Sequence, residues 1–425
     1  MKILWTVNLL PVPFANKIGV KTSVLGGWVE SMASKFSSEA EYELAIACKC
    51  DLKDKRFESV DGVSYYTLNY SKKHAEAELK KRCEEIVEEF KPDLIHIEGT
   101  EFLHSKVMLY VAKEKNIKCV VSAQGILNGQ YNYQCGQLQI DDMMFSSSLT
   151  KIFTAWILHL RKTRWYKPRM KTEKDVLKNA EYFLGRTTWD RAHLYAINKD
   201  AKYFSCNRIL RSPFYEKNWD KDKIERHSIY VGNGYFALKG LHYVLEAMPE
   251  LIREYPDVKL YVAGASPIYK NDKRPFFKRG YSAYLAKLIK DLKIENHIEF
   301  TGPLKAEGVA VRLSKTHVYV LCSAIENSPN TLGEAMMIGT PSVASYVGGV
   351  PDMAKDGIEA LFFRNDDSAL LAWNIKRIFD NDELALKLSE NAKARAKITH
   401  DGDKNFKDLL KAYEEISKSA VGERK

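Results

Sequence analysis

The sequence contains no apolar run long enough to cross a membrane. A transmembrane helix needs about 18 to 20 consecutive apolar residues, and polar or charged residues interrupt each apolar stretch before that length. The opening MKILWTVNLLPVPFA has one lysine before a mildly apolar run, but Asn8 and two prolines interrupt the run and no convincing cleavage site follows. We therefore expect a first β-strand here, not a signal peptide, and a cytoplasmic protein.

Cysteine is scarce in this chain. There are seven cysteines, an odd number, and none forms a Cys-x-x-Cys pair. Neither a disulfide framework nor a zinc-binding motif is therefore indicated. Cys48 and Cys50 are expected to fill a core as reduced thiols, which agrees with the cytoplasmic expectation.

Basic residues outnumber acidic residues only moderately. The 65 Lys and Arg residues against 55 Asp and Glu give a formal net charge of +10, which in most proteins serves solubility. At 425 residues, the chain exceeds the size that one hydrophobic core usually supports. We therefore expect a first domain at 1–206, a linker at 207–222, a second domain at 223–400, and a last helix at 401–425 that crosses back toward the first domain.

Strand and helix patterns alternate along both halves. Short apolar runs typical of buried strands are separated by amphipathic stretches typical of helices, and this order predicts parallel, doubly wound sheets. The fold class is therefore α/β, with two Rossmann-like domains. In the first half, the predicted strands are 2–7, 43–48, 63–68, 94–97, 118–123 and 201–205.

The most informative stretch is 316–352. Its apolar run 318–322 predicts a buried parallel strand, and a helix follows until Thr340-Pro341 ends it. Glu326 then lies in the loop at the carboxyl end of the strand, and Glu334 lies in the first helical turn. Ligands of open α/β sheets bind at this edge, where the N–H groups of a helix start favour an anion. The stretch therefore predicts a phosphate site.

Each of these residues also has a structural explanation when it is taken alone. Thr331 and Glu334 have the spacing of a capping box, which would account for Glu334 without a ligand. Glu326 is equally compatible with an ordinary solvated loop acid. The functional interpretation depends on the residues being taken together.

Taken together, Glu326, the seven residues before Glu334, and the GGVPD loop at 348–352 resemble the donor site of retaining glycosyltransferase family 4. The resemblance extends through 228–394 and more loosely over the first half. It implies the GT-B architecture, in which two doubly wound domains face each other across a cleft. The second domain is then expected to bind a nucleotide diphosphate sugar, and the first domain mainly the acceptor.

A second motif, GNGYFALKG, follows the predicted strand 228–231. Its G-x-G-x-x-A pattern suits a dinucleotide, but the next strand, 258–262, runs into Ala263-Gly264-Ala265 and lacks the required acid. Lys239-Gly240 instead resembles the Lys-Gly of family 4, whose lysine contacts the donor diphosphate. Asn233 stands where that family usually has arginine, so Lys239 is left to carry more of the phosphate charge.

The resemblance implies further donor contacts. A Gly-Gly pair in the loop before the first long helix is expected to approach the diphosphate, and the turn after 298–301 is expected to lie against the nucleobase. Glu334 is implied to bind the ribose hydroxyls, and Glu326 the donor sugar. We expect Glu326 and Lys239 to be catalytic, and the donor contacts to be Gly26, Gly27, Asn233, Lys239, Gly264, Pro303, Leu304, Glu326, Asn330, Thr331, Leu332 and Glu334.

Three residues are candidates for the acceptor side. Gln124 precedes a glycine at the position where family members often have histidine, and its amide can act only through hydrogen bonds. His96 and His104 are the histidines that would contribute instead. For each histidine, the alternative that we favour is a structural role in the core.

A basic amphipathic helix is predicted at 149–171. Its apolar residues recur at helical spacing, and no Asp or Glu interrupts 143–172. Together with Trp156 and Trp165, this pattern predicts contact with an anionic membrane surface, which suits a lipid-linked acceptor. The alternative is a helix that packs its apolar stripe on the protein's own sheet.

The sequence predicts neither a metal ion nor another cofactor. Asp220-Lys221-Asp222 has paired acids, but they lie in a charged linker and not at a strand end. The resemblance implies retaining, metal-independent transfer of a hexose-type sugar to a glycan or lipid-linked acceptor. This would serve bacterial surface polysaccharide biosynthesis at the inner face of the plasma membrane, without a nucleic-acid partner. Two alternatives remain open: a nucleotide-sugar epimerase of the same architecture, and a non-catalytic basic protein that binds nucleic acid or membrane.

Overall fold

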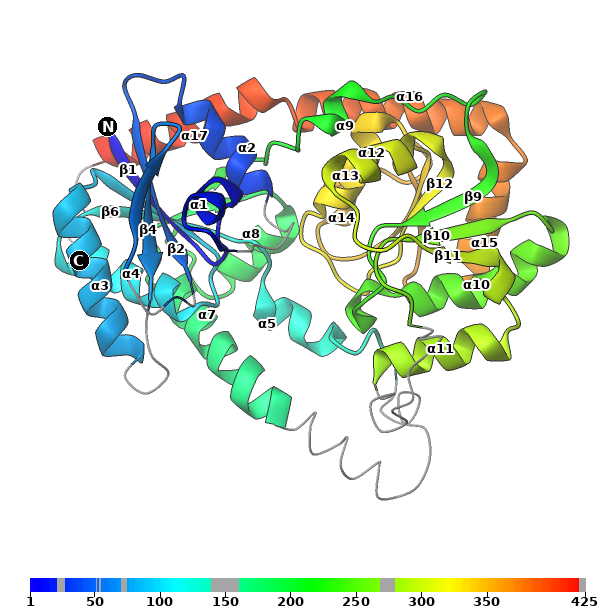
Figure 1. The fold of residues 1–425 in the computed structure, drawn as a ribbon, viewed down its shortest axis with the longest axis horizontal. Coiled ribbons are helices and arrows are strands. Elements are labelled where there is room, and N and C mark those ends of the chain that lie inside the picture. The colour runs from blue at the N-terminus through cyan, green and yellow to red at the C-terminus, as the bar shows by residue number, and fades with distance from the viewer. Residues whose placement is uncertain are drawn as a thin grey trace. The chain divides into compact units, whose positions relative to one another are not determined.

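The computed structural model of the protein describes residues 1–20, 27–50, 52, 55–69, 75–138, 160–267 and 280–419. These residues form two compact units, each built on its own sheet (Figure 1). The first unit draws on Met1–Gly129, Trp165–Arg211 and His400–Lys425, and the second on Gln130–Arg164 and Ser212–Thr399.

The first sheet has its topological switch between β1 and β5. β2, β4 and β3 lie on one side of β1, and β5 to β8 lie on the other side. The strand order is β3-β4-β2-β1-β5-β6-β7-β8, and only the β3–β4 pair is antiparallel. The strands are β1 (Lys2–Val7), β2 (Glu43–Lys49), β3 (Phe57–Val60), β4 (Val63–Leu68), β5 (Leu94–Glu98), β6 (Lys118–Ser122), β7 (Tyr182–Gly185) and β8 (Lys202–Ser205).

Helices cover both faces of this sheet because its strands are apolar on both sides. Ile3, Trp5 and Val7 belong to one core with α2 and α17, whereas Leu4 belongs to the other core, with α3 and α4. The helices of this unit are α1 (Val12–Lys17), α2 (Gly27–Phe36), α3 (Ala75–Phe90), α4 (Leu103–Glu114), α7 (Lys167–Asn179), α8 (Thr188–Tyr195) and α17 (Gly402–Lys418), with α5 (Leu127–Gln130) at its edge.

The last helix, α17, packs on the first sheet through its apolar stripe. Phe406 meets Phe36 edge to face, with ring centroids 4.9 Å apart. Tyr413 is fully buried, and its hydroxyl accepts a hydrogen bond of 3.0 Å from Trp5 Nε1.

The second sheet is entirely parallel, in the order β11-β10-β9-β12-β13-β14. Its topological switch lies between β9 and β12, which are neighbours although two strands separate them along the chain. A crevice at the carboxyl ends of these two strands is where such sheets bind ligands. The strands are β9 (Glu225–Val231), β10 (Lys259–Val262), β11 (Ile298–Phe300), β12 (Thr316–Leu321), β13 (Ser342–Ser345) and β14 (Leu361–Phe363).

Helices also flank the second sheet, and several begin at its carboxyl edge. Among the described residues of the whole chain, no helix combines the length and the apolar character that spanning a membrane requires. The helical segments are η1 (Tyr131–Tyr133), η2 (Lys162–Tyr166), α9 (Pro213–Glu216), η3 (Ala237–Lys239), α10 (Leu241–Glu254), α11 (Tyr281–Asp291), η5 (Glu295–His297), α12 (Ala306–Lys315), α13 (Asn330–Ile338), α14 (Val350–Met353), α15 (Ser368–Phe379) and α16 (Asp382–Thr399).

Two of the predicted boundaries differ from the structure. The first domain was expected to run to residue 206, but the described residues of 130–164 group with the second unit. The linker expected at 207–222 is largely packed structure, since Phe214 in α9 is fully buried and Trp219 is 8% exposed. The backbone N–H of Trp219 donates to the Ile338 carbonyl oxygen at 2.9 Å, which ties this stretch to α13.

Candidate functional site

The loop after β9 carries Lys239 in a tightly held position. Lys239 ends η3, and Gly240 then adopts a left-handed φ of 69°. A Cβ atom on Gly240 would lie 1.8 Å from the carbonyl oxygen of Cys322, so only glycine allows this close approach. The Cys322 thiol donates to the Lys239 carbonyl oxygen at 3.1 Å, and Ala324 N donates to the Leu238 carbonyl oxygen at 2.8 Å. The loop after β12 therefore fixes the backbone that bears Lys239.

Glu326 lies in that loop and forms an ion pair with Lys239. Its Oε1 atom contacts Lys239 Nζ and accepts a hydrogen bond of 2.7 Å from Ser323 Oγ. The side chain of Glu326 is 11% exposed and that of Lys239 is 29% exposed, so the pair remains open to solvent on the lysine side. The structure thus brings together two residues that are far apart in the sequence.

The glycine-rich loop after β13 holds Glu326 from the other side. Gly349 N donates to the Glu326 carbonyl oxygen at 3.1 Å. At Gly348, where φ is 51°, a Cβ atom would lie 1.9 Å from that same oxygen. Three loops at the carboxyl edge of the second sheet therefore converge on the pair of Lys239 and Glu326.

The helix α13 begins at this edge with its first turn formed by Asn330, Thr331 and Leu332. Its N-cap residue is Pro329, which has no side-chain cap, so the capping box considered for Thr331 and Glu334 is wrong. Glu334 is instead buried within the helix, at 3% exposure. The start of a helix carries unsatisfied N–H groups and a positive dipole end, which favour an anion.

A second group of predicted donor residues gathers beyond β9. Gly264 and Gly302 exchange two backbone hydrogen bonds, of 2.9 and 3.0 Å, and Pro303 and Leu304 follow directly. At Gly264, where φ is 123°, a Cβ atom would lie 2.5 Å from the ring of Tyr235. A small pocket beside Gly264 is lined by Gly234, Tyr235, Ala263 and Ala265, among others; Gly264, Pro303 and Leu304 are not among its lining residues.

Asn233 shapes the loop after β9. Its Oδ1 atom accepts a hydrogen bond of 3.0 Å from the backbone N–H of Tyr235, which is an Asx turn. A neutral amide used in this way adds no positive charge toward a phosphate. The expected contact of Asn233 with the donor stays a prediction.

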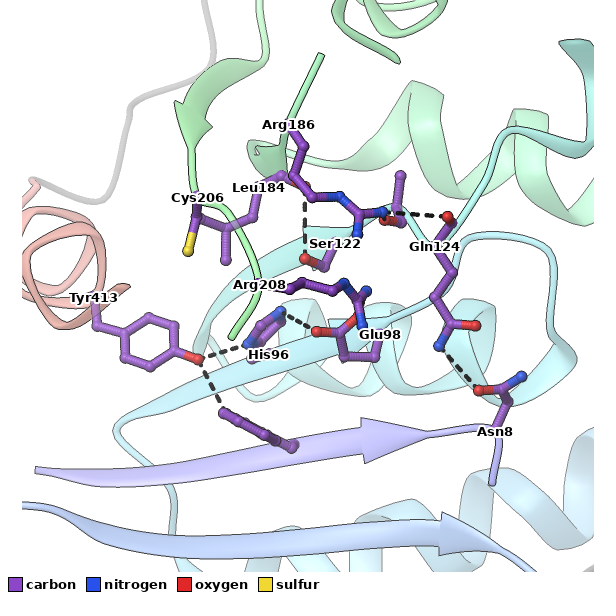
Figure 2. A network of polar contacts seen from close by, with 12 residues as sticks. Asn8, His96, Glu98, Ser122, Gln124, Leu184, Arg186, Cys206, Arg208 and Tyr413 are labelled. Carbon is purple, nitrogen blue, oxygen red and sulfur yellow. Dashed lines mark hydrogen bonds and ion pairs between the residues drawn. The ribbon is translucent and has the colours of Figure 1, made fainter. Parts of the chain in front are cut away.

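In the first unit, His96 belongs to a buried polar network at the carboxyl end of β5 (Figure 2). Its Nδ1 atom lies 2.6 Å from the Tyr413 hydroxyl, and its Nε2 atom lies 3.5 Å from Glu98 Oε1. Burial lowers the pKa of His96 to about 4, so the ring is neutral at neutral pH. His96 joins the sheet to α17.

His104 is also buried, in the first turn of α4. Its ring stacks on Phe102 with centroids 5.2 Å apart, and burial lowers its pKa to about 3. His96 and His104 are 3% and 0% exposed, so neither side chain is open to an acceptor in this structure. The structural alternative accounts for both, because each side chain packs within the core of the first unit.

Gln124 lies where the loops after three strands of the first sheet meet. Its Nε2 atom donates to Asn8 Oδ1, after β1, at 2.9 Å. Arg186, after β7, donates from Nη2 to the carbonyl oxygens of Ala123 and Gln124 at 2.8 and 3.2 Å. Gln124 is therefore the acceptor-side candidate that the structure places at the edge of the sheet, in line with a hydrogen-bonding role.

The buried ion pair of Glu98 and Arg208 was not predicted. Arg208 Nη2 donates to Glu98 Oε2 at 3.0 Å, and its guanidinium lies 3.2 Å from the centroid of the Trp28 ring. The two residues are 5% and 9% exposed, and burial lowers the pKa of Arg208 to about 9. Glu98 stands at a predicted strand end, but no local pattern identifies its partner 110 positions away.

Two acids near the loop after β5 were also missed. Glu173 in α7 is fully buried and accepts hydrogen bonds from Thr100 Oγ1 at 3.0 Å and from the N–H groups of Leu127 and Asn128 at 2.7 Å. It therefore holds the loop after β5 against the start of α5. Burial raises the pKa of Glu101, in the same loop, to about 7.

Three other predictions depend on how much of their sequence is described. Gly26 lies outside the described residues, while Gly27 begins α2, and a Cβ atom there would lie 2.7 Å from Arg211 Cδ.

Residues 149–159 of the predicted basic helix also lie outside the described residues. The described remainder is helical and exposes Trp165, which is 43% exposed. The exposed basic side chains from there through α7 are Arg161, Lys162, Arg164, Lys167, Lys171, Lys174 and Lys178.

The paired acids of the supposed linker are engaged locally. Asp220 pairs with Lys223 at 2.8 Å and accepts from the N–H of Asp222 at 3.1 Å. Within the described ranges, no three His, Cys, Asp or Glu side chains gather closely enough to hold a metal ion.

Solved structures with this architecture span the chain. A sucrose-phosphate synthase from Thermosynechococcus elongatus superposes with a TM-score of 0.72 at 16% identity, over 98% of this chain and 99% of that one. Anabaena HepE in complex with UDP superposes with a TM-score of 0.67 at 14% identity, over 98% of this chain and 100% of that one. At such identities the likeness concerns the fold alone, and the fold is GT-B.

The sequence comparison is more specific for the second unit. Residues 212–395, less than half of the chain, match the family model described as Glycosyl transferases group 1. The alpha-D-kanosaminyltransferase of Streptomyces kanamyceticus is 29% identical over 164 residues, which are 39% of this chain and 39% of the relative. The match therefore spans less than half of that relative's length.

Proposed function

We propose that the protein is a retaining glycosyltransferase of family 4, which moves a hexose-type sugar from a nucleotide diphosphate sugar to a glycan or lipid-linked acceptor. The observation that carries the proposal is the contact between Lys239 and Glu326 at the topological switch of the second sheet. A cation and a carboxylate at this edge suit a ligand that combines a diphosphate with sugar hydroxyls. The group 1 family match of 212–395 supports the same conclusion.

The proposed reaction places the developing negative charge next to Lys239. The bond between the anomeric carbon and the diphosphate oxygen breaks, and its electron pair leaves with the diphosphate. The acceptor oxygen bonds to the anomeric carbon on the same face and passes its proton to the departing phosphate oxygen. In this proposal the Lys239 ammonium group and the N–H groups around Asn330 and Thr331, at the start of α13, stabilise the leaving group. The Leu332 N–H donates to the Pro329 carbonyl oxygen at 3.1 Å, so its expected part is to close this first turn.

The two carboxylates of the motif take different parts in this proposal. Glu326 holds the donor sugar near its reacting carbon, and its contact with Lys239 positions it beside the diphosphate site. Glu334 binds the ribose hydroxyls, as the family resemblance implies. We assign no general base, metal ion or other cofactor to the reaction.

We place the acceptor mainly on the first unit, near Gln124. The exposed cations Arg161, Lys162, Arg164 and Lys167, together with Trp165, suit an anionic membrane surface, because aromatic rings and lysine or arginine favour the lipid headgroup region. A cytoplasmic enzyme bound to the inner face of the plasma membrane would meet a lipid-linked acceptor there. Bacterial surface polysaccharide biosynthesis is the process that we propose it serves.

A thermal-shift screen against UDP-, GDP- and ADP-sugars tests the donor site directly. We expect one nucleotide series to raise the melting temperature, and Lys239→Met to reduce that rise while some nucleotide binding and the unliganded melting temperature are retained. No shift with any nucleotide sugar would contradict the proposal. Sugar conversion in the absence of an acceptor would indicate the epimerase instead.

Two further measurements test the finer parts of the proposal. Transfer activity is expected to survive EDTA, and activity that is lost and then restored by magnesium or manganese would overturn the metal-free assignment. The protein is expected to sediment with phosphatidylglycerol vesicles at low salt but not with phosphatidylcholine vesicles. Absence of binding to both would remove the membrane contact.

A further inference from the structure

A left-handed turn from the first half of the chain lies directly on η3, the short helix that bears Lys239. Gly136 and Gln137 have φ values of 58° and 60°. A Cβ atom on Gly136 would lie 2.2 Å from the carbonyl oxygen of Ala237, the first residue of η3. Gln137 is not a glycine, so its left-handed backbone is strained, and surrounding contacts must hold it in place.

Those contacts come from the first turn of α10. The Tyr243 hydroxyl donates to the Gly136 carbonyl oxygen at 2.8 Å and lies 3.1 Å from Gln137 Oε1. His242 Nε2 lies 3.2 Å from the same carbonyl oxygen, and its Nδ1 lies 3.0 Å from the Tyr281 hydroxyl. Because a carbonyl oxygen only accepts, Nε2 of His242 carries the proton and Nδ1 accepts from Tyr281.

The side chain of Gln137 is also held from the far edge of the second sheet. Asn365, which follows β14, donates from Nδ2 to Gln137 Oε1 at 2.7 Å. His242, Tyr243 and Asn365 are 0%, 6% and 8% exposed, so these polar groups are buried and would be left without partners if the turn moved away. The turn is therefore a fixed part of the second unit.

Lys239 is consequently held between two segments. On one side, the loop after β12 binds the backbone of η3 through Cys322 and Ala324. On the other side, the turn at Gly136 packs against the Ala237 carbonyl group, at the opposite end of the same three-residue helix. A short 3-10 helix has few internal hydrogen bonds, so its position depends on such neighbours.

We infer that the turn at 136–137 is a positioning element for Lys239, which orders the diphosphate-binding loop of the donor site. This inference rests on the proposed function and extends it. The turn does not touch the donor in this proposal and acts through η3. A group that stabilises a leaving diphosphate must already be in place, because a misplacement of about 1 Å can cost about 100-fold in rate.

Two variants of the full-length chain test this inference from different directions. Tyr243→Phe removes one hydroxyl that binds the turn and leaves the packing in place. Gly136→Ala adds a Cβ atom that forces either the turn or η3 to move. Each is expected to weaken the binding of the nucleoside diphosphate selected by the thermal-shift screen about tenfold, since ionic hydrogen bonds depend strongly on geometry.

A double-mutant cycle with Lys239→Met separates positioning from general damage. If the turn acts through Lys239, then Tyr243→Phe and Gly136→Ala will weaken binding no further in the Lys239→Met background. Gln137→Glu keeps an acceptor for Tyr243 and Asn365 and is expected to bind normally, whereas Gln137→Gly, which tolerates the backbone angle but lacks the acceptor, is expected to bind less tightly. Asn132→Ala, at an exposed position in η1, is the control.

The outcomes distinguish this inference from the proposed function. Normal nucleotide affinity in folded Tyr243→Phe and Gly136→Ala proteins would overturn the inference and leave the glycosyltransferase proposal intact. Equal losses with and without Lys239 would also overturn it, because the turn would then act only on general stability. A wild-type protein that binds none of UDP, GDP and ADP would overturn the proposed function and the inference together.

Discussion

Replacing Glu326 with glutamine is expected to change donor binding and turnover in opposite directions. Without a ligand, Lys239 is paired with Glu326, so an incoming diphosphate must compete with this carboxylate for the ammonium group. Glutamine is nearly the same size and retains an oxygen that can accept from Ser323 Oγ. The substitution therefore removes the charge and leaves the shape of the loop unchanged.

The size of each effect follows from the exposure of the pair. Two unit charges about 4 Å apart interact by about 4 kcal/mol at an effective dielectric constant of about 20. The Lys239 side chain is 29% exposed, so solvent screening and the loss of its own hydration leave a smaller net value. We expect release of Lys239 to strengthen diphosphate binding by about 1 kcal/mol, or about fivefold.

Turnover is expected to fall much further. If Glu326 holds the donor sugar at the reacting carbon, then Glu326→Gln removes an interaction that is strongest in the transition state, and kcat should drop about 100-fold. Binding is measured by calorimetric titration with the nucleoside diphosphate, and kcat by steady-state transfer from the saturating nucleotide sugar. Unfolding temperatures establish that the variant is folded.

A matched control comes from a surface ion pair of the first unit. Lys80 Nζ contacts Glu114 Oε2 at 2.8 Å, and both side chains are about half exposed, at 45% and 50%. Glu114→Gln is expected to change neither quantity. Weaker diphosphate binding by Glu326→Gln would refute the competition between the carboxylate and the diphosphate, and an unchanged kcat would refute the role of Glu326 in holding the donor sugar.

Three further predictions concern the fold around the two candidate sites. Glu98→Gln leaves Arg208 buried without its counter-charge and is expected to cost about 3 kcal/mol in the free energy of unfolding, measured with urea; a cost below about 1 kcal/mol would show that the pair is dispensable. Burial lowers the pKa of His104 to about 3, below its unfolded value of about 6.5, so the unfolded state binds the extra proton and stability falls as the pH drops below about 6.5. His104→Phe should therefore lose about 2 kcal/mol less stability than the wild type between pH 7 and pH 5, and an identical loss in both proteins would contradict the neutral buried ring. Gly240→Ala should lower the melting temperature and weaken nucleotide binding, because its Cβ atom would lie 1.8 Å from the Cys322 carbonyl oxygen; normal binding would show that the loop adapts without moving Lys239.

The strands and helices that could be predicted were found from the local spacing of apolar side chains. The strand in 318–322 and the helix that follows it are visible because apolar side chains repeat at the period of each element, which is a property of neighbouring residues. The same holds for Glu326 and the start of α13, since a strand end and a helix start mark the ligand edge of a parallel sheet. A chain of alternating strands and helices was therefore recognisable as α/β, whereas the donor site rests on the family resemblance and stays a prediction.

Contacts between distant residues were decided only by the tertiary structure. From the sequence, His96 was a candidate for the acceptor side with a structural role favoured, and its contact with Tyr413, 317 positions away, places it in the core. Thr331 and Glu334 fit a capping box by spacing, yet the helix begins at Asn330, and this removes the cap.

The grouping of 130–138 with the second unit has the same origin. No local pattern of that segment shows which sheet it joins, and His242, Tyr243 and Asn365 bind it from more than 100 positions away. Sequence by itself determined which elements form and which edge of the second sheet is expected to bind a ligand, because these depend on the periodicity of nearby side chains. The tertiary structure decided which side chains face that site and which support it, because burial and long-range hydrogen bonds exist only once the chain has folded.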